Sequence, residues 1–123
     1  MPLYLDHTIV PAHDKEASAR LLARIFGLEY NGLWGHFAPV KINDTLTLDF
    51  DNRESFESHH YAFLAGEEEF DVILGRVQGE GLSFGSDPFD QDNGKINHHH
   101  GGRGFYFHDP NGHSLEVITH TYV

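Results

Sequence analysis

Histidine is the residue type in this sequence with the most potential for chemistry, with eleven copies in 123 residues. Cysteine is absent, which excludes disulfides, thiolate metal sites and thiol nucleophiles. Any metal ion would therefore be held by nitrogen and oxygen ligands. The side chains of interest are His7, His60 and Glu116, because two imidazoles and one carboxylate can bind a divalent metal and leave coordination positions open.

These three residues lie on segments that the sequence predicts to be strands. The first half is predicted to form a strand, a helix and two strand-like segments, at residues 3–10, 15–26, 33–40 and 45–50. Asp14 suits the N-cap of the helix and Gly27 its C-terminal end. The side chains expected on the buried stripe of this helix are Ala17, Leu21, Leu22, Ile25 and Phe26.

The second half repeats the order of the first. A strand, a helix and three further strands are predicted at 59–64, from 67 to about 79, and at 82–85, 104–108 and 114–119. His7 and His60 each lie on the first strand of their copy, followed at matching distances by Gly27-Leu28 and Gly81-Leu82. The second copy also contains a loop at about 86–102, and a loop of this length is more often functional than idle.

Strand alternation places each of the three side chains on a face with mainly apolar neighbours. A buried carboxylate without a partner is costly, and a cation shared with two imidazoles removes that cost. The sequence therefore predicts a metal site at His7, His60 and Glu116. A hydrogen-bonded histidine at the core or its rim is the alternative that periodicity alone leaves open.

Charge and length limit the other classes of function. The formal net charge is −11, which argues against nucleic acid or an anionic membrane as a partner. The sequence contains no apolar run long enough to span a membrane and no readable secretory signal, so a cytoplasmic location is expected. The length predicts one domain, 1–123, built from module one at about 1–53 and module two at about 54–123.

A family resemblance is carried by three strings: LDHTIVP at 5–11, HYAF at 60–63 and, most specifically, GGRGFYFHDPNGHSLE at 101–116. Together they resemble the vicinal oxygen chelate superfamily, which includes glyoxalases, extradiol dioxygenases, fosfomycin-resistance thiol transferases and bleomycin resistance proteins. Within that superfamily, LTLDF at 46–50 and INHHHGGRG at 96–104 resemble the ChaP-like group.

The resemblance implies an α+β fold of two βαβββ modules, with strands that curl into a metal-binding cleft, usually in a homodimer. It implies divalent metal ligands at His7, His60 and Glu116, and it favours His60 over the adjacent His59. Asp49 lies where glyoxalase-type members have a fourth carboxylate ligand. A hydrogen-bonding role beside the ligands is the other interpretation of Asp49.

Other residues are weaker candidates for the site. Tyr106 resembles a cleft-lining tyrosine that could donate to a substrate oxygen, and aromatic packing is its alternative role. His98 and His100, in a run of three histidines, could act in acid–base catalysis or form a solvated loop. Arg103 is predicted either to bind a substrate carboxylate or to pair with a local acid. Trp34 could line a substrate pocket or pack in the core.

Three functions remain open from the sequence. The first is a non-haem Fe(II) dioxygenase-type oxidoreductase acting on an aromatic or enolised small molecule with adjacent oxygens. The second is a redox-neutral glyoxalase-like lyase or isomerase, or a thiol transferase, using Ni, Zn or Mn. The third is a metal-free protein that binds a small molecule such as an antibiotic.

Overall fold

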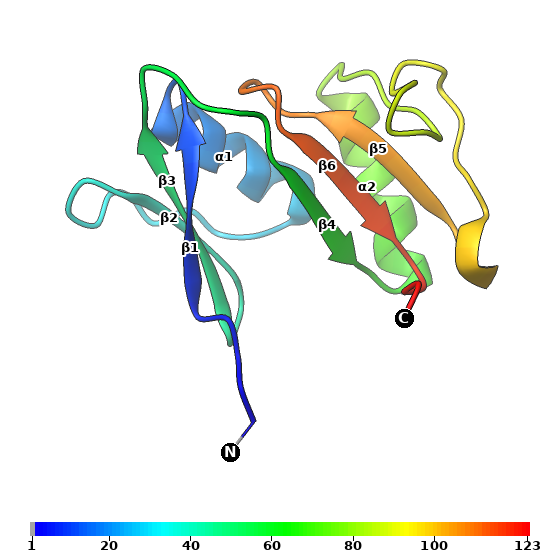
Figure 1. Cartoon of the computed structure of the whole chain (residues 1–123), viewed down its shortest axis with the longest axis horizontal. Coiled ribbons are helices and arrows are strands. Elements are labelled where there is room, and N and C mark those ends of the chain that lie inside the picture. The colour runs from blue at the N-terminus through cyan, green and yellow to red at the C-terminus, as the bar shows by residue number, and fades with distance from the viewer. Residues whose placement is uncertain (1) are drawn as a thin grey trace. The chain divides into compact units, whose positions relative to one another are not determined.

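The computed structural model describes residues 2–123 and divides the chain into two compact units, Met1–Phe56 and Glu57–Val123 (Figure 1). Unit 1 contains β1 (His7–Ala12), α1 (Lys15–Phe26), β2 (Ala38–Asn43) and β3 (Leu46–Asn52). Unit 2 contains β4 (His60–Leu64), α2 (Glu67–Gly79), a short 3-10 turn η1 (His99–Gly101), β5 (Gly104–His108) and β6 (Ser114–Ile118). Each unit is one three-stranded sheet with one helix, which confirms the α+β class.

The sheet of unit 1 has the strand order β1-β3-β2. β1 runs parallel to β3, and β2 runs antiparallel to it. Strand β1 begins at His7, later than the expected Leu3, and it continues through Pro11 to Ala12. Proline is tolerated there because β1 is an edge strand, paired only with β3.

Helix α1 has the predicted boundaries and the predicted caps. The side chain of Asp14 accepts a hydrogen bond of 3.1 Å from the backbone N–H of Ala17, and Gly27 ends the helix with φ +67°. The buried face is rotated from the predicted stripe, because Ala17 is exposed. Small side chains let the helix lie close to its sheet on the face formed by Ser18, Ala19, Leu22, Ala23 and Ile25.

The sheet of unit 2 has the strand order β4-β6-β5 and repeats the pairing of unit 1, with β4 parallel and β5 antiparallel to the central strand. Helix α2 lies behind β5 and β6 in Figure 1. Its buried side chains are Phe70, Ile73 and Val77, and the rings of Phe70 and Phe105 are 5.2 Å apart. The rest of this core is formed by Phe107, Leu115 and Val117.

The segments expected at 33–40 and 82–85 are strands only in part: residues 38–40 begin β2, and the rest contains isolated bridges. In the segment 33–40, Trp34 and Phe37 exchange backbone hydrogen bonds of 2.9 and 3.0 Å across a tight turn. In the segment 82–85, only Gly85 pairs with β5, opposite Tyr106. A Cβ atom on Gly85 would overlap the carbonyl oxygen of Asp90, because the loop folds back against this glycine. No helix in residues 2–123 is long and apolar enough to cross a membrane.

Candidate functional site

His60 and Glu116 come together on the face of unit 2 that α2 does not cover. His60 begins β4 and Glu116 is central in the adjacent strand β6, and strand alternation places both on the same face. The Nε2 atom of His60 lies 3.1 Å from Oε1 of Glu116. The other ring nitrogen, Nδ1, donates to the carbonyl oxygen of Ser114 at 3.1 Å. The ring is therefore oriented with Nε2 toward the carboxylate.

Tyr106 lies beside this pair. It is the cross-strand partner of Glu116 between β5 and β6, and its ring stacks at 6.2 Å from the ring of His60. Burial, followed by the hydrogen bond to Glu116, raises the pKa of Tyr106 to about 12. Tyr106 is therefore a protonated phenol at neutral pH and acts as a hydrogen-bond donor rather than as a base.

A hollow of about 400 Å³ opens next to these residues. Its volume lies within the range of small-molecule sites. One wall comes from the sheet and the other from the loop that precedes η1. The lining residues are His60, Tyr106, His108 and Ser114 of the sheet, with Pro88 and Gln91 of the loop.

His7 and Asp49 form a second polar group, in unit 1. Asp49 pairs in register with Ile9, so it shares the face of His7 that α1 does not cover. The Nδ1 atom of His7 is 2.7 Å from the carboxylate of Asp6. The pKa of His7 is raised, chiefly by this hydrogen bond, with further contributions from the charges of Asp6 and Asp49. Asp49 itself is only 9% exposed, although it is a carboxylate.

The predicted strand faces are correct, but the expectation of apolar, buried surroundings is wrong for both histidines. The side chains of His7 and His60 are 62% and 51% exposed, and only Glu116, at 16%, is mostly buried. The reason is that each helix covers the opposite face of its sheet. Within residues 2–123, the structure contains no group of three or more histidine and acidic side chains arranged to hold a metal. It brings together His60 with Glu116, and His7 with Asp49.

The weaker candidates lie elsewhere. Arg103 pairs with Glu67 and Asp71 of α2 at 3.0 and 2.7 Å, and its guanidinium lies 4.4 Å from the ring centre of Phe70. Its alternative role, pairing with acids rather than with substrate, is the one that the structure supports. Trp34 is 74% exposed in unit 1.

The three histidines at 98–100 are exposed and precede β5 at Gly104. Gly104 pairs with Ile118, whereas His60 pairs with Ser114 at the other end of the sheet. His100 has φ +58°, an uncommon conformation for a residue with a side chain. The structure therefore places this run of histidines at the end of the sheet away from His60.

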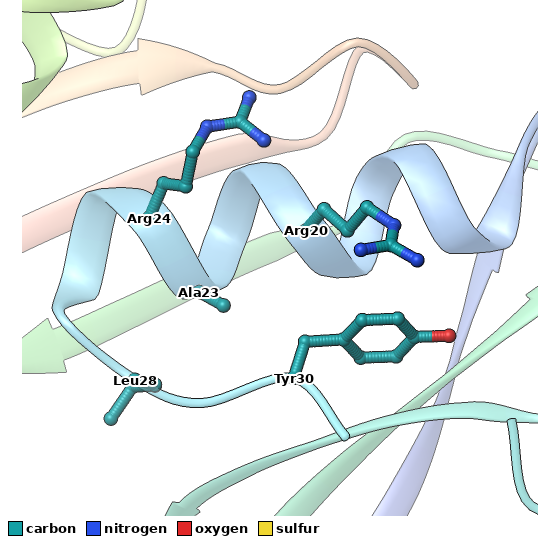
Figure 2. A pocket seen from close by; sticks show the side chains of 5 residues that line it. All are labelled: Arg20, Ala23, Arg24, Leu28 and Tyr30. Atoms are coloured by element: carbon teal, nitrogen blue, oxygen red, sulfur yellow. The ribbon is translucent and has the colours of Figure 1, made fainter. Parts of the chain in front are cut away.

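A smaller hollow of about 260 Å³ lies between α1 and the segment that follows it (Figure 2). The guanidinium of Arg20 is 5.0 Å from the ring centre of Tyr30, whose hydroxyl donates to Glu16 at 2.9 Å. Figure 2 shows that Arg24 points away from Tyr30. The residues that line this hollow include no histidine and no carboxylate, and it is not the site predicted from the sequence.

Comparisons with known proteins place the chain in a family, although no family model matches it. The solved structure of "Oxidase ChaP-H2" is 50% identical, with 99% of this chain and 97% of that chain covered and a TM-score of 0.94. "Oxidase ChaP-H1" is 45% identical, with 98% of each chain covered and a TM-score of 0.92. "Glutathione transferase FosA" of Serratia marcescens is 26% identical over 120 residues, 92% of this chain and 78% of that protein. The chain belongs to the vicinal oxygen chelate superfamily.

Within the vicinal oxygen chelate superfamily, the similarity is to the ChaP-like group, as the sequence predicted. The fosfomycin resistance protein FosX of Listeria monocytogenes shares the fold, with 21% identity and a TM-score of 0.76. These neighbours confirm the glyoxalase-like fold and indicate a vicinal oxygen chelate enzyme.

The donor atoms of unit 2 fit the divalent metal that this superfamily implies. A lone pair on Nε2 of His60 would repel the carboxylate oxygen 3.1 Å away, so the pair requires a shared proton or cation. The hydrogen bond from Nδ1 to Ser114 fixes the tautomer that leaves Nε2 to bind a metal. In unit 1, the Nδ1 atom of His7 likewise forms a hydrogen bond, with the carboxylate of Asp6, which leaves Nε2 available.

Sequence reasoning missed three residues that line the hollow: Gln91 of the loop, and Ser114 and His108 of the sheet. The only signal was the length of the loop at 86–102, which indicated a functional segment without indicating which of its residues matter. His113 was also missed. It is fully buried, and its Nδ1 accepts the backbone N–H of His59 at 2.9 Å, which anchors the start of β4.

Proposed function

We propose that this protein is a metal-dependent oxidoreductase whose divalent metal, with Fe(II) favoured, is held by His7, His60 and Glu116. The observation that carries the proposal is the His60–Glu116 pair, 3.1 Å apart beside a hollow of about 400 Å³. The 50% identity to a protein described as an oxidase supports it. His7 is included because it occupies the position of His60 in the repeated motif.

The proposed substrate is an aromatic or enolised small molecule with two adjacent oxygens. A metal at these ligands would stabilise negative charge on the substrate oxygens, and Fe(II) would also offer a position for dioxygen. Tyr106 would keep its phenolic proton, since its pKa is about 12, and would donate it in a hydrogen bond to a substrate oxygen in place of Glu116 once that carboxylate holds the metal. Arg103 is left out of the proposed site, because its guanidinium already binds Glu67 and Asp71.

Two measurements test this function. Metal analysis of protein purified without chelator is expected to find a bound divalent metal, and metal-free protein would instead favour an antibiotic-binding role. Protein loaded with Fe(II) under anaerobic conditions is then mixed with oxygenated buffer and a panel of catechols. We expect oxygen uptake that is lost in Glu116→Ala, and inactivity of the loaded protein across the whole panel would contradict the proposal.

A redox-neutral reaction of the glyoxalase or thiol-transferase type is the second candidate. Two observations favour it: the buried Asp49 shares a face with His7, and the chain is 26% identical to a glutathione transferase. In this alternative Asp49 is a fourth ligand and the metal is Ni, Zn or Mn. Substrate conversion under strict anaerobiosis, together with metal loss in Asp49→Asn, would decide for it. A homodimer and a cytoplasmic location also form part of the proposal.

A further inference from the structure

Gln91 occupies an unusual position in the loop that borders the hollow of unit 2. It is only 6% exposed, although its neighbours in the loop are largely exposed. It lines the hollow together with His60 and Tyr106. A buried amide in an exposed loop is held there by specific contacts, and the partners of Gln91 define what its free atom can do.

The orientation of the Gln91 amide is fixed by its nitrogen. Nε2 donates to the carbonyl oxygen of Pro88 at 3.0 Å and to Oγ of Ser114 at 2.9 Å, so both of its hydrogens are used. A carbonyl oxygen can only accept a hydrogen bond, so the amide cannot be flipped without placing two acceptors against each other. Oε1 is therefore the one side-chain atom of Gln91 left to interact with another molecule.

Oε1 of Gln91 has no hydrogen-bond partner. It is the only buried side-chain nitrogen or oxygen of this kind in the described part of the chain, residues 2–123. A buried acceptor left without a donor is unfavourable, which indicates that a donor reaches it in the working protein. Gln91 lines the adjacent hollow, but Oε1 itself has almost no exposed surface, so a donor in the hollow would reach it only after the surrounding side chains shift slightly.

The loop around Gln91 is held firmly enough to present this oxygen at a fixed place. Gly85 and Asn97 pair with β5 through backbone hydrogen bonds of 2.8–3.0 Å, at Tyr106 and Gly104 respectively. Inside the loop, Oδ1 of Asn93 accepts backbone N–H groups, while its Nδ2 donates to Oγ of Ser86 at 2.9 Å. Both ends of the segment are thus attached to the strand that carries Tyr106.

We propose that Gln91 is a substrate-recognition residue whose Oε1 accepts a hydrogen bond from an O–H group of the ligand in this hollow. The inference rests on the proposed function, because it assumes that the ligand chelates a metal beside His60. It adds a requirement to the substrate class: a third group, a hydrogen-bond donor, next to the two chelating oxygens. A site that offers a locked acceptor discriminates against an analogue in which that donor is blocked.

The test compares trihydroxybenzenes with their methyl ethers. Pyrogallol is paired with 3-methoxycatechol, and 1,2,4-trihydroxybenzene with 4-methoxycatechol, because each pair keeps the catechol and differs in one O–H. Dissociation constants are measured by calorimetry under anaerobic conditions on protein loaded with Zn(II), which does not change oxidation state. Wild type is expected to prefer one trihydroxy compound over its ether by about 3- to 10-fold. Gln91→Met is expected to lose this preference and keep its Zn(II), and Gln78→Met on the exposed side of α2 is the matched control.

The outcomes separate the two levels of the proposal. Catechol binding with the same preference in wild type and Gln91→Met overturns the role of Gln91 and leaves the metal site standing. The same preference, with Gln91→Met less stable than wild type, would mean that Oε1 accepts a hydrogen bond from a buried water. Failure of wild type to bind any catechol overturns the substrate class and this inference together. Should Gln91→Met not fold, Ser114→Ala removes one anchor of the amide and is expected to weaken the preference.

Discussion

Among the side chains of the candidate site, Tyr106 has the environment that differs most clearly from water. Its hydroxyl is partly buried and bonds to Glu116, and its pKa is raised to about 12 from an ordinary value of 10. The folded protein therefore holds the phenolic proton more tightly than the unfolded chain does. The stability that Tyr106 contributes is present below pH 10 and is lost as the pH rises through about 12.

Spectroscopic titration of the metal-free protein can test this. Phenolate absorbance is measured against pH in wild type and in Tyr106→Phe, and the difference between the two curves isolates one tyrosine. We expect that difference to rise near pH 12, with a smaller loss of stability between pH 10 and 12 in the variant. A difference curve centred near pH 10 would show that Glu116 and burial do not act on Tyr106 as the structure indicates.

Arg103 illustrates what a single sequence cannot decide about a residue. Its type and its place before β5 were compatible with either substrate binding or a structural pair. The choice depends on Glu67 and Asp71, which are more than thirty positions away in sequence and approach Arg103 only when α2 packs against the sheet. Gln91 was missed for a related reason, because its anchor Ser114 is also distant in sequence.

Among the elements, those governed by local rules were predictable. Helix α1 was predicted with its limits and both caps, because Asp14 and Gly27 act on backbone groups within a few residues of themselves. The turn between β5 and β6 also follows local rules, because Oδ1 of Asp109 accepts the backbone N–H groups of Asn111 and His113 at 2.9 Å. The strands were less predictable: β2 overlaps the expected segment 33–40 only at residues 38–40, and the segment 82–85 forms only a bridge. Strand pairing depends on which neighbouring strand is present rather than on local pattern alone.

The contribution of the α1 cap can be measured. Asp14→Ala removes the acceptor of the Ala17 N–H, and we expect the free energy of unfolding to fall by about 1 kcal/mol. Urea denaturation followed by circular dichroism gives this value directly. Asp44→Ala, in the exposed turn between β2 and β3, is the control and should change stability by less than about 0.5 kcal/mol. Equal effects of the two substitutions would mean that the loss reflects charge rather than capping.

For the whole molecule, the repeat visible in the sequence corresponds to two units with the same strand order and pairing. This repeat, together with the family resemblance, selected His7, His60 and Glu116. Strand alternation assigned their faces correctly, but it could not tell which face the helix would cover, so the burial of both histidines was overestimated. Two of the proposed ligands belong to unit 2 and one to unit 1. The metal proposed above would be bound fully only when all three ligands are available, so its binding would be linked to folding.

That linkage leads to a prediction about thermal unfolding. A metal that binds the folded state alone adds about 2.7 kcal/mol of stability when its free concentration is one hundred times its dissociation constant. We expect Zn(II) or anaerobic Fe(II) to raise the unfolding temperature of wild type, and the rise to be lost in both His7→Ala and Glu116→Ala, although these residues belong to different units. His13→Ala, an exposed histidine before α1, should respond like wild type. If His7→Ala kept the full rise, the metal would be held by unit 2 alone, and His7 would have to be removed from the ligand set.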